Sequence, residues 1–335
     1  MRSKTMAEEK DVILDVQNLK MYFRTAKGFN KQTVKAVDDV SFSVKKGQTL
    51  GLVGESGCGK TTTGKCILRI NDPTDGHIIY KGRDIAKLKK SELKENRRDI
   101  QLIFQDPYGS LNPRQNLRTI LKDAIVGDHK PHSKEEISSE IDRLLTLVEL
   151  SPTMADRYPH ELSGGQRQRL GIARALACKP TLVVCDEPVS ALDVSIQAQI
   201  INLFERLKEE LGLTYIFIAH DIAVVKHIAD VIAVMYLGHI VEMMDAKQIF
   251  RNPVHPYTRS LLSAVPTVDY DEERTRERII LQGEVPSPTH APSGCPFHPR
   301  CVYAKDICSK ECPALKDIGG NHSVACHFAE QFSKD

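Results

Sequence analysis

Eight residues near the start of the chain have the types and spacing that bind phosphate. Residues 54–61, GESGCGKT, place glycines before a final lysine and threonine. The glycines let the backbone turn its N–H groups inward. Lys60 is then expected to reach the β- and γ-phosphates, and the Thr61 hydroxyl to bind Mg²⁺. The pattern predicts a phosphate-binding loop.

The flanking residues supply the context that such a loop requires. Residues 49–53, TLGLV, form an apolar run that predicts a buried strand, and residues 62–69 predict a helix. A helix that begins at the loop adds partial positive charge where phosphate would bind. The alternative is a chance glycine turn, and the strand and helix on either side argue against it.

A second set of polar residues follows three further strand-like runs. Asp186 and Glu187 come directly after residues 181–185, Gln105 follows residues 100–104, and His220 follows residues 214–219. Ligands of parallel sheets bind at the carboxyl ends of strands. Asp186 is therefore expected to hold Mg²⁺, and Glu187 to orient or deprotonate a water molecule.

Residues 162–166, LSGGQ, are a more specific motif. Ser163 is expected to cap the helix that follows, and the two glycines allow close backbone approach. The chain thus contains a second helix start of the kind that binds anions. An ordinary helix cap is the alternative, and the phosphate-binding loop in the same chain argues against it.

The remaining elements predict an α/β fold. Residues 12–53 read as a β-rich entry layer in which Tyr22 or Phe23 could stack on a base, although the pattern alone favours plain strand packing. Residues 76–85 predict a hairpin around Lys81-Gly82, and residues 87–99 a charged helical stretch. Residues 113–178 predict helices, with Ser133 and Glu136 as a capping box. Strands that alternate with helices imply a parallel sheet.

Composition excludes several classes of protein. The 335 residues carry a net charge of +2, which argues against a nucleic-acid binder that depends on bulk charge. No apolar run reaches the roughly 18 residues of a membrane span. The first residues, MRSKTMAEEKD, lack the apolar segment of a secretory signal.

The motifs together resemble the nucleotide-binding subunit of ABC transporters over about residues 12–250, with a helical subdomain at about 106–178. The resemblance implies a P-loop ABC ATPase with a RecA-like parallel-sheet core, an antiparallel β entry layer and an α-helical signature subdomain. It implies Mg²⁺ bound by Thr61, Gln105 and Asp186, Glu187 as general base, and His220 as the sensor of the γ-phosphate. The residues implied to contact ATP are Phe23, Gly54, Ser56, Gly57, Gly59, Lys60, Thr61, Thr62, Gln105, Ser163, Gly165, Gln166, Asp186 and Asp193.

In this family two cassettes face head to tail, so Ser163 and Gly165 would serve the nucleotide of the partner cassette. Residues 255–262, HPYTRSLL, resemble the C-terminal extension of peptide and nickel importer ATPases, and residues 105–114 resemble the second of the paired oligopeptide ATPases. The implied partners are a paralogous ATPase, two transmembrane permease subunits and an extracytoplasmic peptide-binding protein, at the cytoplasmic face of the membrane. The alternatives are a nickel or other solute importer, a non-transport ABC ATPase, and a module that senses iron or redox state.

Five of the nine cysteines lie within residues 251–335, which we expect to form a small extension. In a reducing compartment this clustering favours metal over disulfides. Thiolates at loose spacing can hold an iron–sulfur cluster, whereas zinc prefers a close pair, present only as Cys308 and Cys312. Unliganded thiols are a third possibility. The family resemblance implies one [4Fe–4S] cluster on Cys295, Cys301, Cys308 and Cys326. His298, His322 and His327 lie nearby and are expected to be surface residues.

Overall fold

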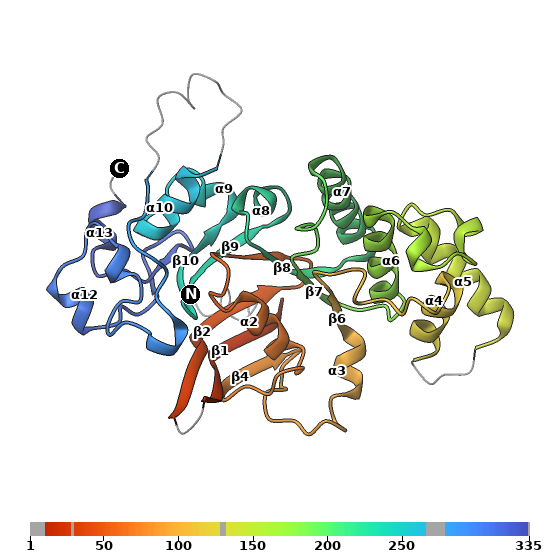
Figure 1. Ribbon diagram of the computed structural model, residues 1–335, viewed down its shortest axis with the longest axis horizontal. Helices are drawn as coiled ribbons and strands as arrows, with labels where there is room; N and C mark the ends of the chain where they lie inside the picture. The colour runs from red at the N-terminus through yellow and green to blue at the C-terminus, as the bar shows by residue number, and fades with distance from the viewer. Residues whose placement is uncertain (1–10, 28–29, 128–131, 266–278, 334–335) are drawn as a thin grey trace, which may run out of the picture. The chain divides into compact units, whose positions relative to one another are not determined.

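The computed structural model describes residues 11–27, 30–127, 132–265 and 279–333. The chain divides into two units, one joining Met1–Lys87 to Ala219–Asp335 and the other formed by Leu88–Ile218. Most of the helices and strands are labelled in Figure 1. The phosphate loop belongs to the first unit, whereas Gln105, Asp186 and Ser163 belong to the second.

An antiparallel sheet opens the first unit and confirms the predicted entry layer. Its strand order is β2-β1-β4-β5, made of β1 (Val12–Lys27), β2 (Asn30–Lys45), β4 (Asp75–Tyr80) and β5 (Arg83–Asp84). The predicted hairpin between β4 and β5 turns at Lys81 and Gly82, both with positive φ. Two consecutive positive φ angles are typical of a tight two-residue hairpin turn.

The second sheet of the first unit carries the phosphate loop. Its strands in spatial order are β11 (Lys316–Asp317), β12 (Ser323–Val324), β10 (His239–Asp245), β9 (Val231–Tyr236) and β3 (Thr49–Val53). All five residues of β3 are buried, as expected of a strand covered on both faces. Leu50–Val53 pair in parallel with β9. The strands β11 and β12 come from the predicted extension, so the extension completes this sheet.

Short helices surround these strands. They are α2 (Lys60–Ile67), α8 (Ile222–Ile228), α9 (Ala246–Ile249), α10 (Pro256–Ser263), α12 (Asp306–Lys310) and α13 (Ala329–Phe332), with 3₁₀ turns η3 (Pro288–His290) and η4 (His298–Arg300). Figure 1 shows α12 and α13 in the blue C-terminal segment beside α10. Tyr236, Tyr257 and Phe297 are fully buried together at the point where β9, α10 and this segment meet.

The second unit contains three parallel strands and most of the long helices. The strands β6 (Ile100–Ile103), β7 (Leu182–Asp186) and β8 (Thr214–Ala219) pair in that order. The helices are α3 (Lys94–Asp99), α4 (Leu117–Val126), α5 (Lys134–Leu147), α6 (Gly164–Leu176) and α7 (Val194–Leu211), with 3₁₀ turns η1 (Pro152–Met154) and η2 (Pro159–Glu161).

Local signals in the sequence set the ends of these helices. Ser133 and Glu136 form the predicted capping box of α5, and α7 ends at Gly212, whose φ of 65° suits glycine. Of the predicted charged helical stretch, only residues 94–99 are helical, and turns precede them. No helix in the described ranges is both long enough and apolar enough to span a membrane.

Candidate functional site

The backbone of the phosphate loop between β3 and α2 depends on its glycines. Gly54, Gly57 and Gly59 have φ angles of 151°, 80° and 108°. A Cβ atom on Gly54 would overlap the carbonyl oxygen of Met235, and one on Gly59 would overlap that of Ala36. Gly57 has open space around it. Two glycines are therefore required by close backbone packing, and the third by its conformation alone.

The Lys60 side chain binds the backbone of its own loop. Its ammonium donates hydrogen bonds to the carbonyl oxygens of Gly54 at 2.6 Å and Glu55 at 3.0 Å, and the side chain is buried. The helix α2 begins at Lys60 without a capping side chain. A helix start of this kind, next to a buried cation, is suited to a bound anion.

The other predicted residues of the loop surround this centre. Ser56 and Gly57 are exposed at the tip, while Thr61 and Thr62 lie partly buried in the first turn of α2. Burial raises the pKa of the Cys58 thiol, against the opposing effect of Lys60. Cys58 therefore stays protonated and packs as a small apolar residue.

Two supports of the phosphate loop were not anticipated from the sequence. Both act on Glu55: the Tyr257 hydroxyl accepts a hydrogen bond from its N–H at 2.9 Å, and Arg300 donates to its carboxylate at 2.8 and 3.3 Å. Tyr257 and Arg300 are 202 and 245 residues away in sequence. No local pattern pairs residues at such separation.

The geometry of the entry sheet favours Phe23 over Tyr22 as the base-stacking residue. The Tyr22 hydroxyl donates a hydrogen bond of 2.5 Å to Asp38, and burial together with this bond raises the pKa of Tyr22. The Tyr22 hydroxyl is thus hydrogen-bonded within its own sheet. Phe23 is 37% exposed, so its ring face is accessible. His220, also in the first unit, is exposed directly after β8.

In the second unit, the structure brings Gln105 and Glu187 together. The amide of Gln105, just after β6, donates to the carboxylate of Glu187 at 2.7 Å. Asp186 ends β7 and is 7% exposed. Glu187 has a φ of 46°, and its N–H donates to the carbonyl of Ile218 at 3.0 Å. A left-handed glutamate is uncommon, and this hydrogen bond helps to hold it.

The LSGGQ loop forms a helix cap, as predicted. The Ser163 hydroxyl accepts from the N–H of Gln166 at 3.3 Å, and the Gln166 side chain accepts from the N–H of Ser163 at 3.0 Å. A Cβ atom on Gly165 would lie 2.7 Å from the Ile196 side chain on α7. Asp193, the N-cap residue of α7, is exposed and makes no side-chain capping bond.

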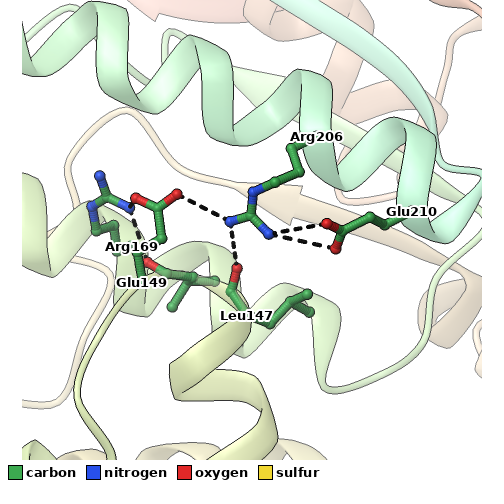
Figure 2. Close-up of polar contacts among 6 residues, drawn as sticks. Leu147, Glu149, Arg169, Arg206 and Glu210 are labelled. Carbon is green, nitrogen blue, oxygen red and sulfur yellow. Dashed lines mark hydrogen bonds and ion pairs between the residues drawn. The ribbon is translucent and has the colours of Figure 1, made fainter.

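An ion-pair network fixes α6 to its neighbours (Figure 2). Glu149, just after α5, accepts from Arg169 on α6 at 2.5 Å and from Arg206 on α7 at 3.2 Å. Arg206 also donates to the carbonyl of Leu147 at 2.9 Å and pairs with Glu210 at 3.4 Å. The two arginines therefore bind both charges and helix-end carbonyls, which holds the helix that starts at Ser163.

The four cysteines assigned to a cluster lie near one another, and Cys312 lies apart. Cys301, Cys308 and Cys326 are all close enough to act electrostatically on Cys295, whose N–H also donates to the Cys308 carbonyl at 2.7 Å. Burial raises the pKa of Cys295 to about 12. The Cys312 thiol is instead influenced electrostatically by Asp38, Asp39 and Lys35. In the part of the chain that the structure describes, no group of three or more Cys, His, Asp or Glu side chains is arranged to hold a single metal ion.

The expectation that His322 is a surface residue is wrong. His322 is 7% exposed, and its Nε2 lies 2.7 Å from the fully buried carboxylate of Glu242. The same carboxylate accepts from the N–H groups of Val254 and His255 at 2.7 and 3.0 Å. A buried carboxylate needs such partners, so His322 is part of the core that joins β10 to α10.

Comparison with known proteins identifies the family to which these motifs belong. Residues 37–190 match the family model described as "ABC transporter", and residues 241–308 match "Oligopeptide/dipeptide transporter, C-terminal region". The chain is 51% identical over 326 residues to the oligopeptide transport ATP-binding protein AppF of Bacillus subtilis, covering 96% of this chain and 99% of that protein. It is 47% identical over 326 residues to the Escherichia coli protein OppF, covering 96% and 97%.

A solved structure agrees with the fold. A dimeric ATP-binding cassette in a post-hydrolysis state, bound to ADP and phosphate, superposes with a TM-score of 0.63 at 28% identity, over 70% of this chain and 98% of that one. The chain belongs to the ABC transporter family of ATPases, in the group that carries the oligopeptide/dipeptide transporter C-terminal region.

Proposed function

We propose that this chain is the ATP-hydrolysing subunit that powers import of oligopeptides or dipeptides across the cytoplasmic membrane. The observation that carries the proposal is the match of residues 241–308 to the oligopeptide/dipeptide transporter C-terminal region. The names of AppF and OppF as oligopeptide transport ATP-binding proteins support it. Its partners would be a paralogous ATPase, two permease subunits and an extracytoplasmic peptide-binding protein, with this chain at the cytoplasmic face.

Purification from membranes tests the assembly. A tagged chain should co-purify with two permease subunits and one second cassette, identified by mass. The complex, reconstituted in liposomes with its binding protein, should take up labelled peptides in an ATP-dependent manner. Uptake of nickel but not of peptides would replace peptide import by the alternative, and an absence of permeases would favour an ABC ATPase without transport.

At the catalytic site, the donor types fit magnesium, because a threonine hydroxyl, an amide oxygen and a carboxylate are hard oxygen ligands. Thr61, Gln105 and Asp186 would hold Mg²⁺, which when bound neutralises phosphate charge. Glu187 would accept the proton of the attacking water, and the Gln105 amide, 2.7 Å from it, would orient the carboxylate. His220 would contact the γ-phosphate, and Asp193 would link the two sites of a dimer.

The role of Glu187 is tested by Glu187→Gln, which keeps its shape but removes the base. We expect ATP hydrolysis to fall by about a hundredfold or more, as for loss of a general base, while ATP binding persists and a closed dimer accumulates. Glu209→Gln, on the exposed face of α7, is the matched control and should hydrolyse ATP normally. Near-normal turnover in Glu187→Gln would exclude Glu187 as the base.

We also propose that Cys295, Cys301, Cys308 and Cys326 ligate one structural [4Fe–4S] cluster. The electrostatic influence of these cysteines on one another supports this, because an iron–sulfur cluster is held by cysteine thiolates. Anaerobic purification with iron, sulfide and zinc analysis tests it. Cys301→Ser should lose iron and sulfide, and Cys312→Ser should keep both. Stoichiometric zinc without sulfide, or no metal at all, would contradict the cluster.

A further inference from the structure

The C-terminal segment holds the side chain of Glu55 in the phosphate loop. Arg300 binds both carboxylate oxygens of Glu55, with its Nη1 at 2.8 Å and its Nη2 at 3.3 Å. The Arg300 side chain is only 8% exposed, whereas that of Glu55 is 28% exposed. A two-point contact of this kind fixes both the position and the orientation of the carboxylate.

The same segment also holds the backbone of Glu55 through an aromatic cluster. Phe297 packs against Tyr236 and Tyr257 with ring centroids 5.2 and 5.4 Å apart, and the two tyrosines lie 4.7 Å from each other. Tyr257 then accepts the N–H of Glu55 at 2.9 Å. Phe297 lies two residues after Cys295, and Arg300 lies directly before Cys301.

The contacts at Glu55 connect directly to Lys60, the residue expected to bind phosphate. The carbonyl of Glu55 accepts from Lys60 at 3.0 Å, so the peptide units on both sides of Glu55 are fixed, one by Tyr257 and one by Lys60. The carboxylate of Glu55 lies in the loop that must accept the charge of ATP. Because Arg300 is largely desolvated, its positive charge offsets that of Glu55 more strongly than a surface cation would.

We propose that Arg300 and Tyr257 are positioning residues of the phosphate loop, through which the C-terminal segment sets the affinity of the cassette for ATP. Arg300 neutralises Glu55, and Tyr257 fixes the direction of its N–H. Neither side chain touches the phosphates in this role. The proposal assigns to the extension an effect on nucleotide binding that is separate from peptide transport and from the presence of a metal cluster.

A double-mutant cycle on the full-length chain tests the neutralising role of Arg300. Arg300→Met should raise the Kd for MgATP by about tenfold, equivalent to ~1.4 kcal/mol, with kcat within about twofold of the wild type. Glu55→Gln removes the charge that Arg300 balances and should change the Kd by less than about threefold. Adding Arg300→Met to Glu55→Gln should then have little further effect. Arg300→Lys should recover part of the affinity.

A purely structural Arg300 would behave differently. Arg300→Met would then raise the Kd for MgATP by the same factor whether Glu or Gln stands at position 55, and that result would overturn the proposal. An unchanged Kd in folded Arg300→Met would also overturn it. Arg251→Met, at an exposed arginine of the same unit, is the control and should bind ATP normally. If Arg300→Met does not fold, Arg300→Lys and Tyr257→Phe replace it. Both should then weaken binding measurably, and an unchanged Kd in both would overturn the proposal.

Discussion

The two glycine loops of this chain begin helices in different ways. The phosphate loop has three glycines with positive φ, and α2 starts from it without a side-chain cap. The LSGGQ loop has no glycine with positive φ, and Ser163 and Gln166 cap α6 reciprocally. The first is shaped by distant backbone at Ala36 and Met235, whereas the second is shaped by residues three positions apart.

We propose that this difference separates a primary anion site from an accessory one. At α2 no capping side chain occupies the helix start, so a phosphate is the natural partner of its N–H groups. At α6 the Ser163 hydroxyl already accepts the N–H of Gln166. An accessory loop of this kind suits a site in which the LSGGQ residues of one cassette complete the nucleotide site of another. Mutations that affect one loop should therefore leave the other intact.

The largest expected effect comes from Gly59→Ala. Its Cβ atom would overlap the Ala36 carbonyl oxygen at a φ of 108°, so the loop must shift to accommodate it. We expect MgATP affinity to fall by about a thousandfold or more, ~4 kcal/mol. Gly57→Ala is the matched control, because a Cβ atom there would have nothing within 4 Å. It should lower MgATP affinity by about tenfold at most, through the strain of an alanine in the left-handed conformation. Titration of both variants with MgATP checks this, and equal losses would contradict it.

The next effect concerns acid stability near the long-range support of the phosphate loop. His255 caps α10 by accepting the N–H of Tyr257 at 3.1 Å, and burial lowers its pKa from 6.5 to about 4. The unfolded chain therefore binds more protons than the folded one between pH 6.5 and 4. The contribution of His255 to stability is fully present above pH 6.5 and falls by roughly 3 kcal/mol as pH drops through this window.

His255→Asn tests this pH dependence, because asparagine can accept the same N–H without titrating. Urea unfolding of the wild type and of His255→Asn at several pH values between 7 and 4.5 measures it. The wild type should lose stability more steeply than the variant as pH falls. Parallel curves would show that His255 does not contribute.

The smallest expected effect on the chain's own ATP affinity comes from Ser163→Arg. We expect the monomer to bind MgATP within about twofold of the wild type, a difference under ~0.5 kcal/mol, because Ser163 belongs to the accessory loop. ATP-driven dimer closure, followed by size-exclusion chromatography in the Glu187→Gln background, should nevertheless be impaired. If the monomer lost affinity as severely as Lys60→Ala, the assignment of Ser163 to the partner's nucleotide would fail.

Sequence reasoning succeeded where the determinants are local. The hairpin at Lys81-Gly82, the capping box at Ser133, the helix cap at Ser163 and the buried run of β7 all follow from residues a few positions apart. It failed at Arg300 and His322, whose partners Glu55 and Glu242 are distant in sequence. A charged residue in a loop is predicted to be exposed to solvent unless its partner is known. These pairs come together only when the chain folds.

The pairing of Glu55 with Arg300 also bears on when, during synthesis, the chain becomes able to bind ATP tightly. The two residues are 245 positions apart, so at 5–20 residues per second Arg300 is synthesised about 12 to 50 s after the phosphate loop. During that time the ribosome holds a chain with a complete GESGCGKT motif but without the residues that brace Glu55. Contacts of such long range form late in folding. Tight ATP binding would then appear only once the C-terminal segment has folded, so that a chain cut short before Arg300 would compete poorly for nucleotide.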